Sequence, residues 1–325
     1  MFGPLMHRLA YFFSCAAFSA LIATPVADAL AQGGERFRTF WRGQWVDYVE
    51  VGDYAITEGD IIIGHKDEVR AWREAVERGQ AQMADTLKGL SIDSATRLWN
   101  MRVGGVVVIP YTIDAGNETR IKAAIDEVNR VMVGVLRWIP RTAEADYVAF
   151  NLTSANSGGA CSSFVGRRGG RQEIDGDPEC SVATLVHEMG HAMGLRHVQQ
   201  DARARAFVDV RLSAMDPAKR FNSEPVFATR TFGGHDYASI MHYSRTSFPA
   251  SSRERVTLET KPPGIDVGLS SLSPADIDTL LRLYGNAPTR TTIHTNPSGL
   301  RVIVDGTPVT TPATFDWPIG SVHRL

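Results

Sequence analysis

The sequence has few cysteines, no marked excess of charge of either sign and only one long apolar run. Its 325 residues include three cysteines, and the 34 basic residues nearly balance the 36 acidic ones. A formal net charge of −2 gives no electrostatic reason to expect nucleic acid as a partner. The length allows one sizeable domain with smaller attachments.

The one long apolar run lies at the N-terminus and is typical of a secretory signal. Residues 9–23 are uncharged, follow a short basic start, and precede the small-residue pattern Ala-Leu-Ala at positions 29–31. We therefore expect residues 1–31 to be a signal peptide. An uncleaved N-terminal anchor is the alternative, because the uncharged stretch is nearly long enough to span a bilayer. No later stretch approaches ~20 apolar residues, so we expect no membrane span after signal removal.

The cysteines support the same interpretation. Cys15 would leave with the signal, and Cys161 and Cys180 would remain. An even number of cysteines in an exported protein favours one disulfide, and two free thiols are the alternative. We expect secretion into the extracellular space, with the periplasm or the cell surface as other destinations.

The remaining sequence divides into three regions of different character. Residues 32–97 are charged, with helical spacing of apolar residues between positions 66 and 89, and are expected to be an accessory segment. Residues 98–286 carry most of the periodic patterns and are expected to form the main domain. Residues 287–325 hold the short strand patterns LRVIVDG and ATFDW, broken by Asn-Pro and Asp-Gly turns, which predict a linker and a partial β module.

Within the main region, strand and helix patterns are mixed. The β-branched runs predict strands, and apolar residues at helical spacing predict helices. A serine cap precedes the last helix. We expect strands at Val106–Tyr111 and Tyr147–Asn151, a loop at Ser154–Gly170, and helices at Glu118–Trp138, Val182–Met193 and Ser273–Tyr284.

The segment HEMGHAMGLRH at positions 187–197 carries the chemistry. Residues four apart share one helix face, so His187 and His191 can reach the same ion. Gly194 allows the chain to leave the helix sharply and bring His197 to that ion. Three imidazoles with one open position describe a catalytic zinc site, and Glu188 beside the first ligand is placed to act as the general base. A helix with two merely structural histidines is the alternative.

A second element follows 42 residues after the third histidine. The segment SIMHY at positions 239–243 places Met241 two residues before Tyr243. A three-histidine motif with a later Met-turn is the metzincin signature. Without the zinc motif, the same two residues would be interpreted as core methionine and half-buried aromatic.

Four further segments resemble the astacin family of metzincins. They are GGVVVIPYTID from position 104, PRTAEADYVAF from position 140, CSSFVGRRGGRQEI from position 161 and HDYASIMHYSRTSF from position 235. The stretch from Trp99 to Asn286 resembles nearly a whole astacin catalytic domain. This resemblance implies a two-lobed α+β fold with a twisted mixed sheet, an active-site helix and one Zn²⁺ in the cleft between the lobes.

The same resemblance implies roles for individual residues. Tyr243 would be a further zinc ligand in the resting enzyme and would donate a hydrogen bond to the oxyanion during catalysis. Met241 would form an apolar floor beneath the histidines. Cys161 would pair with Cys180.

The accessory region also contains a segment similar to the family's inhibitory motif. Glu58-Gly59-Asp60 matches it, although Thr57 stands where the family usually has phenylalanine. A carboxylate from Asp60 on the metal would displace the attacking water and keep the enzyme latent. An ordinary Gly-Asp turn is the alternative. Residues 32–97 would then be a prosegment that an activating protease removes.

These observations predict a secreted zinc metalloendopeptidase that is made as a latent zymogen and cleaves protein or peptide substrates. A catalytically silent zinc-binding adhesion or recognition protein on the same fold is the second hypothesis. Glu188 and Tyr243 are both present, whereas a decayed enzyme would be expected to have lost one of them, which favours the active enzyme.

Overall fold

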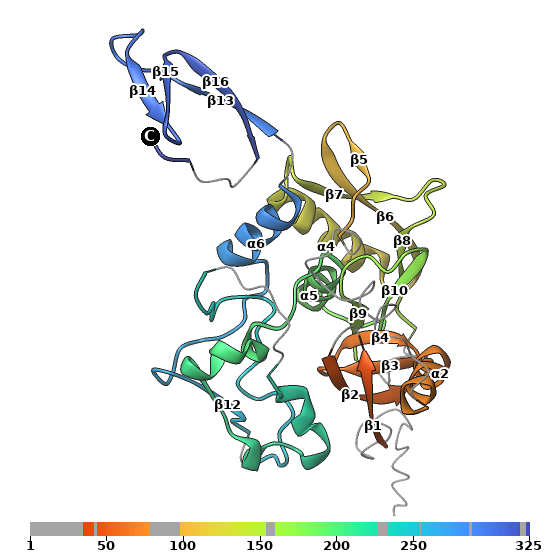
Figure 1. Cartoon of the computed structure of the whole chain (residues 1–325). Helices are drawn as coiled ribbons and strands as arrows, with labels where there is room; N and C mark the ends of the chain where they lie inside the picture. Colours follow the sequence, from red (N-terminus) through yellow and green to blue (C-terminus); the bar gives the residue numbers. More distant parts are fainter. Residues whose placement is uncertain are drawn as a thin grey trace, which may run out of the picture.

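The computed structural model describes residues 35–41, 44–78, 98–153, 160–225, 233–253, 255–285, 288–318 and 323–325 (Figure 1). The expected signal peptide, residues 1–31, and the later part of the helix expected at positions 66–89 lie outside these ranges. None of the helices in the described ranges combines the length and the apolar character that a bilayer span requires.

A mixed sheet forms the first part of the main region. Its strands run in the order β9-β10-β8-β6, and both β5 and β7 pair with β6. The pairings β10·β8, β8·β6 and β6·β7 are parallel, whereas β9·β10 and β5·β6 are antiparallel. The strands are β5 (Arg102–Val103), β6 (Val106–Ala115), β7 (Leu136–Pro140), β8 (Tyr147–Asn151), β9 (Ser162–Phe164) and β10 (Arg171–Asp175).

Two helices pack against this sheet and enclose the main core. They are α4 (Glu118–Val131), capped by the Asn117 side chain, and α5 (Val182–Ala192), capped by the Ser181 side chain. Their apolar faces meet the sheet in one cluster of buried residues that includes Ile109, Trp138 and Phe150. The expected α+β architecture is confirmed.

Two expected elements were wrong in extent. The helix expected to reach Trp138 ends at Val131, and a turn containing Gly134 at φ +79° leads into strand β7. Leu136 and Trp138 are buried while Arg137 is exposed, so this stretch has the alternation of a strand. The loop expected at 154–170 contains strand β9.

The chain after α5 consists mainly of short elements. They are the 3₁₀ turns η1 (Val198–Gln200), η2 (Ala202–Ala206), η3 (Leu212–Ala214) and η4 (Pro217–Ser223), the pair β11 (Val208–Val210) and β12 (Leu258–Thr260), and helix α6 (Pro274–Tyr284). Ser273 and Asp276 form a capping box at the start of α6, as the serine cap predicted. The hydroxyl of Tyr284, at the other end, donates to the Met193 carbonyl at 2.7 Å and ties α6 to α5.

Residues 35–41 and 44–78 form a folded unit for which the sequence predicted only a helix. This N-terminal segment, residues 35–78, has four antiparallel strands followed by a helix. Its last strand pairs in parallel with β9 and extends the main sheet to ten strands, as the orange ribbon beside β9 shows (Figure 1). The elements are β1 (Arg36–Trp41), β2 (Gln44–Val51), β3 (Tyr54–Thr57), β4 (Ile61–His65) and α2 (Lys66–Glu77).

The C-terminal tail folds as two strand pairs. Strand β13 (Pro288–Ile293) pairs with β16 (Ala313–Pro318), and β14 (Arg301–Val304) pairs with β15 (Thr307–Thr310). Strand β14 lies within the pattern LRVIVDG, and strand β16 contains the pattern ATFDW.

Candidate metal centre

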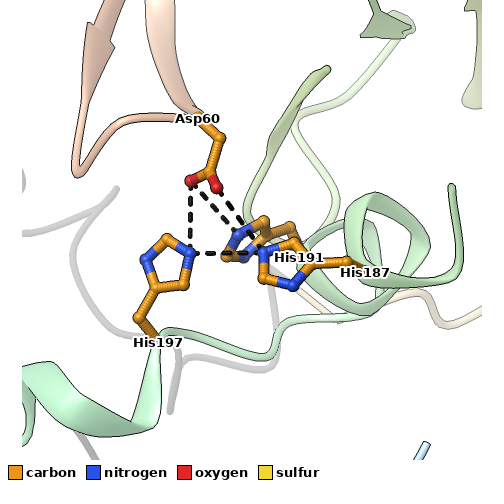
Figure 2. Close-up of side chains that lie close together, drawn as sticks. All are labelled: Asp60, His187, His191 and His197. Atoms are coloured by element: carbon orange, nitrogen blue, oxygen red, sulfur yellow. Dashed lines mark hydrogen bonds and ion pairs between the residues drawn. The ribbon is translucent and has the colours of Figure 1, made fainter. Parts of the chain in front are cut away.

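The three histidines of the motif converge as the spacing predicted. His187 and His191 project from one face of α5, and the chain turns back at Gly194, whose φ of +104° lies in the left-handed region. His197 follows this turn and starts the next 3₁₀ turn. Its imidazole faces the other two, with ring centroids 5.3 Å from His187 and 4.7 Å from His191 (Figure 2).

Hydrogen bonds orient two of the rings so that their Nε2 atoms face the centre. His187 Nδ1 donates to the Ile240 carbonyl at 2.7 Å, and His191 Nδ1 donates to the Leu195 carbonyl at 2.9 Å. A histidine whose Nδ1 carries the proton presents a lone pair on Nε2, which is the form that ligates a metal.

The distances in this cluster fit a tetrahedral metal. One ligand atom each from Asp60, His187, His191 and His197 lies within 4.8 Å of the others, and the His187 and His197 Nε2 atoms are 3.2 Å apart. Zinc–nitrogen bonds of about 2.0–2.1 Å in a tetrahedron place two nitrogens about 3.3 Å apart. The donor set therefore fits Zn²⁺.

Buried polar atoms that lack hydrogen-bond partners within the described residues support the same conclusion. His191 Nε2, Asp60 Oδ1 and Glu188 Oε2 are such atoms, and all three belong to this cluster or lie next to it. A buried polar group without a partner is costly, so several of them together indicate a site built for a ligand or ion.

Asp60 reaches the centre from the N-terminal segment. Its carboxylate lies 3.2 Å from His197 Nε2 and 3.6 Å from the Nε2 atoms of His187 and His191 (Figure 2). The β3–β4 turn brings it there, with Gly59 at φ +88°. Burial alone would raise the pKa of Asp60, but the three imidazoles lower it well below its usual value. The carboxylate therefore faces the metal position in its charged form.

Glu188 and Tyr243 both border the centre. Glu188 is only 1% exposed, and its burial raises the pKa of its carboxyl well above the usual value, with Asp60 adding to the effect. The ring of Tyr243 packs on His197 with centroids 4.6 Å apart, and its hydroxyl donates to the Glu58 carbonyl. The structure thus places Tyr243 beside the centre, and its role as a zinc ligand stays a prediction.

Met241 packs against helix α5 at Gly190. It is buried, and its sulfur contacts the backbone of α5 so closely that a Cβ added to Gly190 would lie 2.7 Å from Sδ. The Asp276 carboxylate fixes the turn before Met241, accepting from the Ser239 hydroxyl at 2.6 Å and from the Ile240 amide at 3.0 Å. The Met241 side chain therefore packs against α5, and its role as an apolar floor beneath the histidines stays a prediction.

Comparison with known proteins agrees with this geometry. The family model of the astacin peptidases matches residues 92–285, which is well over half of the chain. This chain belongs to the astacin family. Zinc is accordingly its cofactor, and the three-histidine cluster has the donors to hold it.

Individual astacins align with the chain at moderate identity. Embryonic protein UVS.2 from Xenopus laevis is 31% identical over 60% of this chain and 38% of its own length. High choriolytic enzyme 1 from Oryzias latipes is 30% identical over 59% of this chain and 71% of its own length. The solved structure of that hatching enzyme zinc-protease covers 59% of this chain and 96% of its own, with 28% identity and a TM-score of 0.52. The chain thus spans well under half of the first of these relatives.

The disulfide implied by the astacin resemblance is present. Cys161 and Cys180 are bonded, with Cα atoms 6.4 Å apart. The bond joins the start of β9 to the residue before the Ser181 cap of α5. It therefore links strand β9 to helix α5.

Sequence reasoning missed one pair of residues at the centre. Glu58 is buried at φ +53°, and its carboxylate accepts from Arg196 at 3.0 Å and lies 3.4 Å from His197 Nδ1. Burial raises the pKa of Glu58, but Arg196 and His197 outweigh it and lower the pKa below its usual value. Both residues adjoin known motifs in the sequence, yet 138 positions separate them, so no local pattern could have paired them.

Proposed function

We propose that this chain is a zinc-dependent endopeptidase that is exported as a zymogen and kept latent by Asp60. The position of the Asp60 carboxylate, 3.2–3.6 Å from all three histidine Nε2 atoms, carries the proposal. A water that attacks a peptide bond must occupy the place that this carboxylate fills. An activating protease would cut the chain between Arg78 and Leu98, and the N-terminal segment must then leave the metal centre before a substrate can bind.

The chain's own residues supply the parts of peptide hydrolysis. Zinc, when bound, polarises the substrate carbonyl and lowers the pKa of water. Glu188 takes a proton from the attacking water and passes it to the leaving amine. The Tyr243 hydroxyl, once the Glu58 carbonyl has gone, is free to donate to the oxyanion.

Export is proposed from three observations. The sequence begins with an apolar stretch followed by a cleavable pattern at positions 29–31. The described part of the chain has a disulfide, which persists in oxidising compartments. One relative is described as a hatching enzyme. N-terminal sequencing of the exported protein should find Gln32 first, and an intact start at Met1 would contradict the proposal.

The second hypothesis, a silent zinc-binding recognition protein, is separated from the first by one assay. Purified zinc-loaded protein is incubated with a quenched casein substrate before and after trypsin digestion that also cuts within residues 35–78, with a zinc chelator and Glu188→Ala as controls. The enzyme hypothesis predicts activity that appears after trypsin, stops with chelator and is lost in Glu188→Ala. Zinc binding without any casein cleavage would favour the silent protein.

A further inference from the structure

The N-terminal segment has a hydrophobic core of its own. Side chains from its strands and from α2 meet in a buried cluster to which the rest of the chain contributes one residue, Val165. The segment's members of this cluster are Val46, Tyr48, Ala55, Ile61, Ile63 and Val69. Tyr48 and Val69 are fully buried in it. Most of the side chains in this cluster therefore come from the segment itself.

Polar contacts within the same segment fasten α2 to its strands. The Trp72 indole donates to the Phe40 carbonyl at 2.6 Å and fastens α2 to β1. Arg70 on α2 donates to Glu50 on β2 at 2.9 Å, and Lys66 donates to the Gly52 carbonyl at 2.7 Å. All of these partners lie within residues 35–78.

A second apolar cluster joins this unit to the rest of the chain. Tyr54, Ile56 and Ile62 pack on Phe164 of β9, and Ile61 and Ile62 pair with β9 in parallel. The Tyr54 hydroxyl also donates to the buried Glu173 carboxylate. These contacts combine main-chain pairing with buried apolar surface, the combination by which an added strand binds a sheet edge.

Charged pairs cross the same boundary. Glu58 pairs with Arg196 beside the metal centre, and Glu68 of α2 pairs with Arg168 after β9. The Glu58–Arg196 pair is largely buried, with side chains 7% and 19% exposed. Truncating one partner of a buried pair leaves the other charge uncompensated, which weakens the complex strongly.

From these contacts we propose that residues 35–78 are a separately folded inhibitor that stays bound without a covalent link. Cutting the chain between Arg78 and Leu98 then yields a tight, inactive two-chain complex. Activity requires a second event, either a cut within the segment or dilution below the dissociation constant. The proposal rests on the latency proposed above. The contacts named here are all made by residues 35–78 with one another or with residues from position 163 onward, and a covalent link between the two parts raises the local concentration of the segment.

The test uses the full chain with a site for a sequence-specific protease inserted between positions 79 and 97. After complete cutting, the protein is passed over a size-exclusion column at about 10 µM and assayed with a quenched peptide. We expect both fragments to elute together and activity to rise less than about twofold. Dilution to low nanomolar concentration should then restore activity slowly, as the inhibitor dissociates.

A matched pair of variants tests whether the Glu58–Arg196 pair contributes to binding of the segment. Glu58→Gln removes a charge that crosses the boundary, whereas Glu50→Gln removes one paired with Arg70 inside the segment. We expect Glu58→Gln to raise the dissociation constant of the cut complex at least about tenfold and Glu50→Gln to change it less than about twofold. Equal effects would remove Glu58 from the interface.

Separation of the fragments at 10 µM, with full activity at once after cutting, would overturn the inference. Failure of the latency proposal gives a different result: the uncut chain would be as active as uncut Asp60→Ala. Co-elution of the two fragments still tests the bound inhibitor in that case, because it does not depend on activity.

Discussion

Replacing Gly190 by alanine tests how the zinc helix rests on the Met-turn. Gly190 lies in α5 directly before His191, and a Cβ there would meet Met241 Sδ at 2.7 Å and Met241 Cε at 3.6 Å. Ordinary contacts between such atoms are about 3.5–4.0 Å, so the sulfur must move by about 1 Å. Met241 is 1% exposed, so the displaced sulfur must repack among buried side chains.

The magnitude follows from two opposing effects. Overpacking a core by one methyl group costs about 1–3 kcal/mol, and glycine to alanine in a helix contributes about 1 kcal/mol in the other direction. Gly190→Ala should therefore lower the free energy of unfolding by up to about 2 kcal/mol. Met241→Ala alone opens a cavity and should cost about 2–5 kcal/mol.

The double variant, Gly190→Ala with Met241→Ala, tests whether the two side chains contact each other. If the new methyl group enters the space left by Met241, the cost of both changes together should be about 1–3 kcal/mol less than the sum of the single costs. Urea unfolding gives the free energy of unfolding of the four zinc-loaded proteins: the parent, the two single variants and the double variant. All four also carry Glu188→Gln, which prevents self-cleavage. Costs that add within about 0.5 kcal/mol would refute direct packing of Met241 on Gly190.

Three other substitutions have defined outcomes. Asp60→Ala should raise cleavage of a quenched peptide by the uncut chain at least about tenfold, and an unchanged rate would mean that another group closes the site. Tyr284→Phe removes the donor to the Met193 carbonyl and should cost about 1–3 kcal/mol in urea unfolding, because a buried carbonyl loses its partner; unchanged stability would contradict that bond. Serine at both Cys161 and Cys180 opens a loop with a sequence separation of 19, for which chain entropy predicts a loss of about 3 kcal/mol, and equal thermal stability of the variant and the oxidised protein would refute it.

The metal centre was predictable because its geometry is local. His187, His191 and Gly194 stand at spacings that a helix and its C-terminal turn convert directly into positions in space. The cap of α6 at Ser273 was predictable for the same reason. The sequence predicts too long a helix at α4 because apolar residues continue past its end. Only the burial of Leu136 against the sheet distinguishes strand from helix there.

The fold of the N-terminal segment was not predictable in this way. Its strands are short and partly charged, and its attachment depends on pairing with β9, about 100 positions away. The missing phenylalanine at Thr57 also has an explanation in the structure. The Thr57 side chain is buried and its hydroxyl donates to the Asp47 carbonyl at 2.8 Å, so this position helps to join β3 to β2.

X-ray absorption of the zinc-loaded protein, after removal of the N-terminal segment, tests the central claim most directly. Three imidazole nitrogens at about 2.0–2.1 Å from zinc are predicted, with one fewer in His197→Ala. A sulfur ligand, or a spectrum that His197→Ala leaves unchanged, would contradict a centre built from His187, His191 and His197.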